Sequence, residues 1–249
     1  MDVSSVLTSA QRVLVVHAHP DDETLATGGL IAALARQGVS VQVLTATRGE
    51  QGEIVPGALT AAQETDLIGH RERELARACA LLGVSGWAFL GTPPARAKQK
   101  HPRRYTDSGM RWLDAAETMA GPGSTAGEEA LSHAAPAEVA ADIAAYAGSI
   151  AADLIITYDR DGGYGHPDHV ALHRPARQAA TELGVGFLEV ASAPDSSGIA
   201  LGGEEYRAVI TAALRSYASQ LTVAGTEVVH VGGQRQPIAV SCTLRVPAT

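Results

Sequence analysis

Two short apolar runs separated by a helical pattern constrain the fold of this chain more than any other feature. Residues 13–16 (VLVV) are typical of a buried strand, residues 24–38 carry apolar side chains at helical spacing, and residues 39–47 form a second strand-like run. A strand, a helix and a strand within about 35 residues make the βαβ unit of a parallel sheet. The sequence therefore predicts an α/β fold.

The same alternation continues toward the C-terminus. Helical patterns occupy residues 66–82, 137–147, 167–183 and 204–220, and strand-like runs occupy residues 87–90, 153–158, 186–192, 226–231 and 237–246. We therefore expect a Rossmann-like, mostly parallel sheet with helices on both faces, in a single domain over residues 1–249. Residues 93–136 lack this regularity, and so long an irregular stretch is typical of a lid or loop region.

Charge and cysteine content exclude several classes of function. The chain has 27 acidic and 19 basic residues, and its net charge of −8 disfavours nucleic-acid binding. Cys79 and Cys242 lie far apart without a CxxC spacing, as expected of a reduced cytoplasmic protein. No run approaches the roughly 18 apolar residues of a membrane span, and no signal peptide is evident. We expect a cytoplasmic protein without nucleic-acid or membrane partners, with homo-oligomer formation left open.

Two similar polar clusters follow two of the predicted strands. HAHPDDE, at residues 17–23, follows the first strand, and DRDGGYGHPDH, at residues 159–169, follows the strand at 153–158. Ligands of open α/β sheets bind beyond the carboxyl ends of the strands, so we expect the two clusters to meet. A helix cap accounts for one aspartate in one cluster, but not for two similar clusters at corresponding positions.

The clusters predict a catalytic metal centre. His19 and Asp22 are three residues apart at a helix start, and a histidine from the second cluster would complete three ligands. Three protein ligands leave a position for water, as in catalytic zinc sites, where the pKa of that water falls to roughly 7. Asp21 and a spare imidazole then supply the proton transfer and oxyanion stabilisation that amide hydrolysis needs. His17 and Asp168 are expected to support these residues from outside.

Other interpretations of the same residues are weaker. His19 and Asp21 form an H-x-D pair that could hold iron in an oxygenase, but that class usually has a β-barrel; the ligands alone do not exclude Fe²⁺. No G-x-G-x-x-G follows the first strand and no G-x-S-x-G occurs, which disfavours nucleotide binding and serine hydrolysis. A sugar- or metal-binding module without catalysis is a further alternative, for which the spare carboxylate of Asp21 has no use.

The motifs AHPDDE and GGYGHPDH resemble those of the LmbE/PIG-L-like zinc-dependent N-deacetylases. This family removes acetyl groups from N-acetylglucosaminyl conjugates, so the resemblance implies a small acetylated amino sugar as substrate. The likeness is greatest to the mycothiol-pathway N-acetylglucosaminyl-inositol deacetylase. A mycothiol S-conjugate amidase and a secondary-metabolite amino-sugar deacetylase are alternatives within the same family.

The resemblance also implies roles for single residues. Asp21 would be the general base, and His166, with Tyr164, would polarise the carbonyl and stabilise the oxyanion. The implied Zn²⁺ ligands are His19, Asp22 and His169.

Three further segments resemble substrate-binding parts of the family. RGEQGE, GHRERELA and YTDSGM imply substrate contacts by Glu53, Arg71 and Asp107, the last two to a polyol such as inositol. The span at 184–203 is shorter than in the mycothiol enzyme, so the pocket rim must differ. The basic stretch at residues 96–104 is expected to be a solvated loop rather than an anion site.

Overall fold

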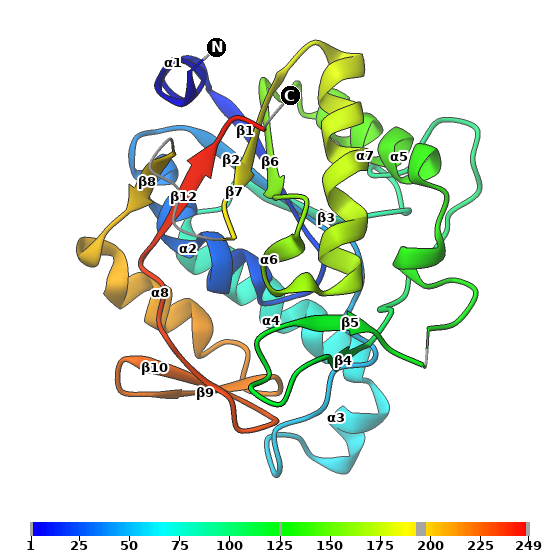
Figure 1. The fold of residues 1–249 in the computed structure, drawn as a ribbon, viewed down its shortest axis with the longest axis vertical. Coiled ribbons are helices and arrows are strands. Elements are labelled where there is room, and N and C mark those ends of the chain that lie inside the picture. The colour runs from blue at the N-terminus through cyan, green and yellow to red at the C-terminus, as the bar shows by residue number, and fades with distance from the viewer. Residues whose placement is uncertain (1, 125, 193–197, 248–249) are drawn as a thin grey trace.

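A seven-stranded mixed sheet forms the centre of the protein (Figure 1). The structure, a computed structural model, describes residues 2–124, 126–192 and 198–247. In spatial order the strands are β3 (Gly86–Phe89), β2 (Ser40–Thr45), β1 (Arg12–His17), β6 (Leu154–Tyr158), β7 (Gly186–Val190), β12 (Ser241–Arg245) and β8 (Ile199–Gly202). The first five run parallel, and β12 pairs antiparallel with both of its neighbours.

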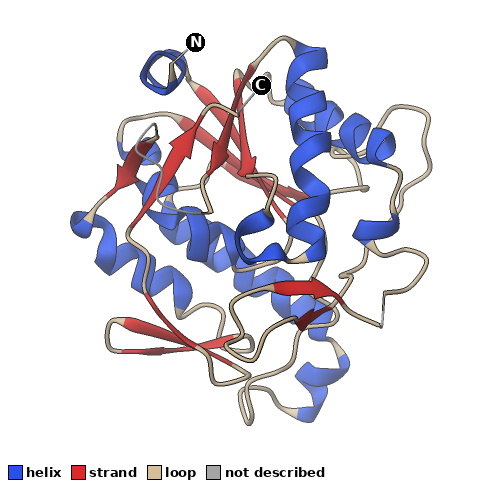
Figure 2. Cartoon of the chain, viewed as in Figure 1, coloured by secondary structure: helices blue, strands red, loops and turns tan. Residues whose placement is uncertain are grey.

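Strand β1 lies in the middle of the sheet and has a core on each side. Its side chains alternate, with Val13 and Val15 in one hydrophobic cluster and Leu14 and Val16 in the other. Helices cover both faces, which explains why the strand is apolar throughout (Figure 2). The face of Val13 packs against α1 (Val3–Ser9), α2 (Asp22–Arg36), α4 (Leu67–Leu82) and α8 (Arg207–Leu214), and the face of Leu14 packs against α5 (Pro136–Ser149) and α7 (Pro167–Leu183).

Smaller elements lie at one end of the main sheet (Figure 1). β4 (Met110–Trp112) and β5 (Ala120–Pro122) pair as a hairpin, and β9 (Leu221–Ala224), β10 (Glu227–His230) and β11 (Arg235–Pro237) form a three-stranded antiparallel sheet. The remaining short helices of the described chain are α3 (Ala61–Thr65), α6 (Gly162–Gly165), η1 (Leu131–His133) and η2 (Glu204–Tyr206).

The predicted α/β fold is confirmed, with two corrections near the C-terminus. The helix predicted over residues 204–220 is too long, because α8 ends at Leu214. Tighter turns follow and bring the fully buried Tyr217 inward. The strand predicted over residues 237–246 is also too long, because β12 begins at Ser241, and it is inserted between β7 and β8. No helix among the described residues combines the length and apolar character that crossing a membrane requires.

The basic stretch at residues 96–104 is not solvated throughout, so that expectation is wrong for Arg96. The Arg96 side chain is only 7% exposed, and its Nη1 lies 2.8 Å from a carboxylate oxygen of both Glu138 and Asp142 on α5. Arg103 also pairs with Glu138 at 2.8 Å. Acidic side chains of α5 thus pair with two of the basic residues in this stretch.

Candidate active site

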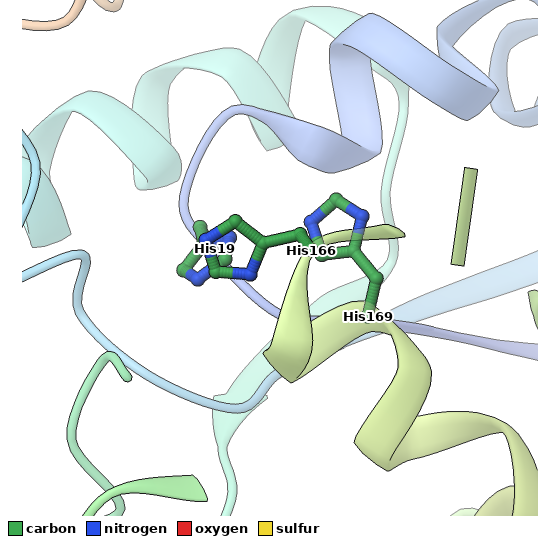
Figure 3. A group of neighbouring side chains, drawn as sticks. All are labelled: His19, His166 and His169. Carbon is green, nitrogen blue, oxygen red and sulfur yellow. The ribbon is translucent and has the colours of Figure 1, made fainter. Parts of the chain in front are cut away.

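Two loops at neighbouring strand ends bring the two sequence clusters together. β1 and β6 pair in parallel with Val13 opposite Leu154, so their carboxyl ends are adjacent. The loop after β1 carries His19, and the start of α7 carries His166 and His169. One ring nitrogen from each of these histidines lies within 4.8 Å of the others (Figure 3). The two clusters therefore form one site.

Asp22 lies against two of these histidines. Its Oδ2 atom is 3.2 Å from Nδ1 of His19 and 3.2 Å from Nε2 of His169. The same oxygen accepts hydrogen bonds from the Tyr158 hydroxyl at 2.8 Å and from the His19 backbone N–H at 2.9 Å. Burial raises the pKa of Asp22, but His169 and His19 outweigh burial, so the pKa lies well below its ordinary value. Asp22 is therefore a carboxylate.

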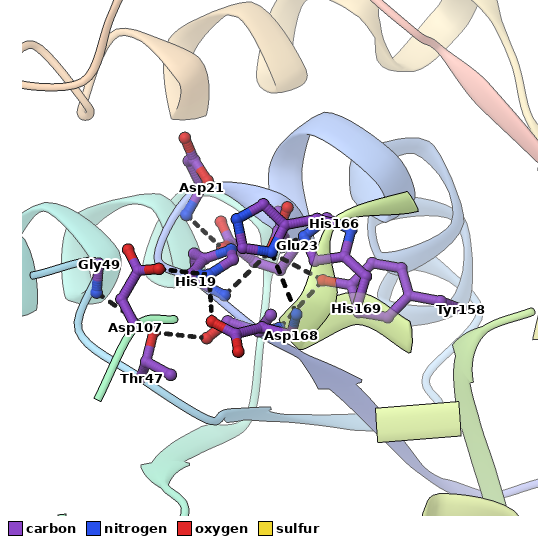
Figure 4. Close-up of polar contacts among 12 residues, drawn as sticks. His19, Asp21, Glu23, Thr47, Gly49, Asp107, Tyr158, His166, Asp168 and His169 are labelled. Carbon is purple, nitrogen blue, oxygen red and sulfur yellow. Dashed lines mark hydrogen bonds and ion pairs between the residues drawn. The ribbon is translucent and has the colours of Figure 1, made fainter. Parts of the chain in front are cut away.

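The other nitrogen of each histidine is occupied, which fixes the orientation of both rings. Nε2 of His19 lies 3.1 Å from Oδ2 of Asp168 (Figure 4), and Nδ1 of His169 lies 3.2 Å from the carbonyl oxygen of Gly162. Nε2 of His169 is buried and faces the carboxylate oxygen of Asp22 without the geometry of a hydrogen bond. Two oriented imidazoles and a carboxylate form a donor set that suits Zn²⁺ or Fe²⁺. The residues thus fit a divalent metal held by His19, Asp22 and His169.

A second group of possible donors lies beside the first but is already engaged by the protein. Oδ1 of Asp107 is 3.6 Å from Nε2 of His19, and Asp168 completes the group. However, Asp168 accepts hydrogen bonds from the backbone N–H and the hydroxyl of Ser108, and Asp107 accepts one from the N–H of Gly109. These carboxylates hold a loop against His19, so they are less available to a metal ion than the three histidines and Asp22.

Asp21 stands next to this donor set in strained backbone. Its φ of 115° and ψ of −30° lie where residues with a side chain are rarely found, at a cost of about 1–3 kcal/mol. Its backbone N–H donates to Oε2 of Glu23 at 3.2 Å (Figure 4). Burial and the neighbouring Asp22 raise the pKa of the Asp21 side chain well above its ordinary value. A pocket-lining carboxyl group with a raised pKa is suited to accept a proton.

His166 offers a hydrogen-bond donor to the pocket that it lines. Its Nδ1 accepts the backbone N–H of Asp168 at 3.2 Å, so the neutral ring carries its proton on Nε2. Burial and the neighbouring His19 and His169 lower the pKa of His166 to about 3, which keeps the ring neutral. His166 can therefore donate from Nε2 to an oxygen atom of a bound molecule.

Tyr164 lies at the edge of the site and is 41% exposed. Its ring centroid is 5.4 Å from that of His169 and 5.8 Å from that of Trp112 on β4. The glycines before it permit this position: Gly162 has φ +64°, and a Cβ there would come within 2.7 Å of the backbone nitrogen of Val170. Because Tyr164 lines the pocket, its hydroxyl can reach a bound molecule.

The three residues predicted to bind substrate line the same pocket, whose volume is about 1330 Å³. They are Glu53, Arg71 and Asp107. Arg71 is 1% exposed, and its Nη2 donates to the backbone carbonyls of Gly52 and Glu53 at 2.9 and 3.1 Å. Its Nε and Nη1 are buried without a hydrogen-bonding partner in the described part of the chain. Arg71 is thus a buried cation with donors to spare at the pocket wall.

Arg71 does not form an ion pair with Glu72 or Glu74, the acidic residues that follow it on the same helix. Glu72 pairs instead with Arg48, whose Nε lies 2.6 Å from the Glu72 carboxylate. Glu74 accepts hydrogen bonds from the backbone N–H and the hydroxyl of Ser219, at 2.8 and 2.6 Å. The acidic residues next to Arg71 therefore have other partners, which favours a role for Arg71 in the pocket.

His17 and Asp168, predicted as supporting residues, are both fully buried beside the site. Nε2 of His17 lies 2.8 Å from Oγ1 of Thr27, and its ring meets the Tyr158 ring edge-on at 5.1 Å between centroids. Asp168 contacts His19, as described above. From these positions a side chain can orient a ligand residue without touching a substrate.

Tyr158 and Tyr217 contribute to the site, although the sequence did not single them out. Tyr158 donates to Asp22, and its ring stacks on that of His169 at 4.1 Å between centroids. Tyr217 donates to the buried Glu23, which in turn holds the Asp21 turn. Tyr158 ends the strand just before the second cluster, a position that could have drawn attention to it, whereas the sequence carries no signal for Tyr217.

The chain is similar to known proteins over the region that contains both motifs. Residues 14–180 match the PIG-L family, described as GlcNAc-PI de-N-acetylase. The chain is 42% identical over 173 residues to a 1D-myo-inositol 2-acetamido-2-deoxy-alpha-D-glucopyranoside deacetylase of Kineococcus radiotolerans, covering 70% of this chain and 45% of that protein. A deacetylase of the same description from Saccharopolyspora erythraea is 40% identical over 200 residues, covering 79% of this chain and 62% of the relative. The matches thus span about half to three fifths of these relatives.

Solved structures share the fold at lower identity. A deacetylase from the teicoplanin biosynthesis pathway superimposes with a TM-score of 0.57 at 24% identity, covering 84% of each chain. An N,N'-diacetylchitobiose deacetylase from Pyrococcus horikoshii superimposes with a TM-score of 0.56 at 19% identity, covering 87% of this chain and 73% of the other.

Proposed function

The chain belongs to the PIG-L family, and on that premise we propose that it is a metal-dependent hydrolase that removes the N-acetyl group of an N-acetylglucosaminyl conjugate. The observation that carries the proposal is one pocket in which His19, Asp22 and His169 converge and which Asp21 and His166 also line. Binding alone would need no carboxyl group of raised pKa held in strained backbone, so the non-enzymatic alternative is disfavoured.

The metal would be held by His19, Asp22 and His169. A divalent ion bound there supplies a Lewis acid and lowers the pKa of a coordinated water to roughly 7. We propose Zn²⁺ as the resident ion because two imidazoles and one carboxylate leave an open coordination position, the arrangement of catalytic zinc. Fe²⁺ is the second candidate because the same ligands suit it.

The chain's own residues divide the remaining work. Asp21 takes the proton of the attacking water, whose oxygen bonds to the acyl carbon. His166 donates from Nε2 to the carbonyl oxygen as negative charge develops there, and Tyr164 can add a second donor. The carbon–nitrogen bond then breaks, and the nitrogen leaves with the proton that Asp21 took from the water and now returns. Acetate and a free amino sugar are the products.

The polar side of the pocket is proposed to hold the sugar and its aglycone. Nε and Nη1 of Arg71 are buried and have no hydrogen-bonding partner among the described residues, and Glu53 and Asp107 line the same pocket. Relatives described as 1D-myo-inositol 2-acetamido-2-deoxy-alpha-D-glucopyranoside deacetylases support an inositol aglycone. We also propose that residues 1–249 form one catalytic domain and that the stretch at 93–136 covers the pocket mouth, because Met110 to Trp112 line the pocket.

A substrate panel tests the proposal. The purified chain is incubated with N-acetylglucosaminyl-inositol, an S-conjugate of mycothiol, N-acetylglucosamine and a glycopeptide carrying N-acetylglucosamine, and released acetate and free amine are quantified. We expect acetate from the inositol conjugate at the highest rate. Cleavage of the S-conjugate alone would favour the amidase, and a preference for the glycopeptide would favour a secondary-metabolite deacetylase. Absence of amine release from every member would contradict the proposal.

A further inference from the structure

Tyr164 stands in a loop that is unusually rich in glycine. Gly162 and Gly163 precede it and Gly165 follows it, and these three have positive φ angles of 64°, 73° and 87°. Glycine loses more conformational freedom on folding than any other residue, so a loop of this composition keeps one shape only where other contacts hold it. The position of the Tyr164 hydroxyl therefore depends on what fixes the neighbouring glycines.

Gly163, the residue directly before Tyr164, is held by the loop of a neighbouring strand. Its N–H donates to the hydroxyl oxygen of Ser192 at 2.9 Å, and Ser192 follows β7 and lines the pocket. β6 and β7 pair in parallel, and their ladder continues into the loops, where the Asp159 N–H donates to the Val190 carbonyl at 3.2 Å. The loops after the two strands therefore leave the sheet side by side.

A buried carboxylate orients the Ser192 hydroxyl. The hydroxyl donates to Oδ1 of Asp159, which is 1% exposed, and the Ser192 N–H donates to Oδ2 of the same side chain at 2.7 Å. Because the single hydroxyl proton points to Asp159, a lone pair of the oxygen is left to accept the N–H of Gly163. Arg245 on β12 holds the carboxylate in turn, with its Nη2 3.2 Å from Oδ2. Ser192 is thus fixed by both of its partners.

We propose that Ser192 is a positioning residue for the hydrolysis: it holds Gly163 so that the Tyr164 hydroxyl faces the carbonyl oxygen of the bound substrate. This inference rests on the proposed function, in which Tyr164 adds a second hydrogen bond to the developing oxyanion. A donor displaced by about 1 Å loses much of its effect on the transition state. Ser192 therefore acts on the rate through Tyr164 and does not touch the reacting atoms itself.

A double-mutant cycle tests whether Ser192 acts through Tyr164. The kcat and KM for the most rapidly cleaved member of the substrate panel are measured in Ser192→Ala, Tyr164→Phe and the double variant. We expect Ser192→Ala to lower kcat about tenfold while KM changes less than about twofold, because the loop serves the transition state. In the Tyr164→Phe background the same change should cost less than about twofold in kcat, because no hydroxyl is left to position. An equal loss in both backgrounds would overturn the inference, as would full kcat in Ser192→Ala.

A conservative variant and a control separate the hydroxyl from general effects on the fold. Ser192→Thr keeps one donor and the acceptor, so it should restore most of the kcat that Ser192→Ala loses. Ser149→Ala removes an exposed hydroxyl that donates to the Tyr146 carbonyl at 2.8 Å, at the end of α5 and away from the pocket, and should leave kcat unchanged. A loss in Ser192→Thr as large as in Ser192→Ala would contradict a role for the hydroxyl.

Amide exchange of Gly163 tests the contact without turnover. In protein carrying isotope-labelled glycine, NMR measures the rate at which this N–H exchanges with water. We expect a rate about tenfold higher in Ser192→Ala and an unchanged rate in Ser192→Thr, because the first variant removes the hydrogen-bond acceptor. An unchanged rate in Ser192→Ala would overturn the inference whether or not any substrate is cleaved. Failure of the proposed function has a different signature: the wild type cleaves no member of the panel, although Ser192→Ala still frees the Gly163 N–H.

Discussion

The Tyr158 hydroxyl donates to Oδ2 of Asp22 at 2.8 Å, the oxygen that lies 3.2 Å from the facing nitrogens of His19 and His169. Tyr158 ends β6 and Asp22 begins α2, so this bond joins the two loops of the site. It also occupies one lone pair of the oxygen and thereby fixes the direction in which the carboxylate faces the histidines. Tyr158 would thus support the proposed metal ligands without being a ligand itself.

Removing that hydroxyl should weaken metal binding and leave the fold intact. We expect Tyr158→Phe to lower Zn²⁺ affinity about 10- to 100-fold, as loss of an outer partner of a metal ligand typically does. Competition with a chromophoric chelator measures the affinity. The control is Tyr146→Phe, which removes a hydroxyl that donates to Gln42 at 3.1 Å away from the site. Equal affinity in the two variants would show that Tyr158 does not orient Asp22.

The assignment of ligands predicts opposite results for two neighbouring histidines. His169→Ala should lose stoichiometric metal, because its buried Nε2 faces Asp22. His166→Ala should keep the metal and lose turnover, because its Nε2 is a hydrogen-bond donor in our account. Metal content by mass spectrometry and acetate release, measured on the same samples, separate the two. If His169→Ala retained the metal and His166→Ala lost it, His166 would be the ligand and His169 the hydrogen-bond donor.

Replacement of the proposed base should leave metal binding in place. Asn tolerates positive φ, so Asp21→Asn can keep the backbone at φ 115° while removing the proton acceptor. We expect kcat to fall about 10²- to 10⁴-fold with unchanged metal content. Asp161→Asn, at an exposed position in the second cluster, is the control and should retain activity. Near-normal turnover in Asp21→Asn would rule out this base.

The internal ion pairs of the basic stretch predict a difference in stability. Asp142 is fully buried and accepts hydrogen bonds at 2.8 Å from Arg96, from the Ala97 N–H and from Tyr105. Asp142→Ala should lower the free energy of unfolding by about 3–5 kcal/mol, because it leaves these buried donors unsatisfied. Glu129→Ala removes an exposed partner of Arg103 and should cost about 1 kcal/mol or less. Urea unfolding of both variants measures the difference, and equal losses would contradict this account.

Glu189 should make the fold sensitive to acid. Burial raises its pKa, but hydrogen bonds from His173 and Arg245 outweigh burial, so its pKa in the folded protein is lowered below 4.5. A lowered pKa stabilises the fold above the unfolded value near 4.5, and that stabilisation is lost as the pH falls through the folded value. The wild-type protein should therefore have a larger free energy of unfolding than Glu189→Gln at pH 6, and this difference should decrease as the pH falls to 3. A constant difference across this range would exclude the linkage.

Local signals in the sequence were enough to predict the elements around the site. α7 covers residues 167–183 as expected, because Pro167 is at its first turn and Gly184 ends it in the left-handed conformation at φ +68°. The alternation of short apolar runs with amphipathic ones predicts β1, α2 and β2 in the same way. The ends of these elements are determined by residues close to them in the sequence.

Tertiary contacts decide what the sequence could not show. The place of β12 between β7 and β8 depends on pairing across some 50 residues. Glu23 and Tyr217 are 194 residues apart, and only the folded chain brings them together. The positive φ of Asp21 and the pairing of Arg96 with α5 are likewise set by the surroundings of these residues rather than by local propensity.

The central claim is that one metal ion in the site of His19, Asp22 and His169 is required to cleave an N-acetyl amide. The direct measurement is acetate release from N-acetylglucosaminyl-inositol by protein stripped of metal and titrated with Zn²⁺. Our account predicts no activity in the stripped protein and full recovery at one equivalent of Zn²⁺, with no recovery in His169→Ala. Undiminished acetate release from the stripped protein would contradict it.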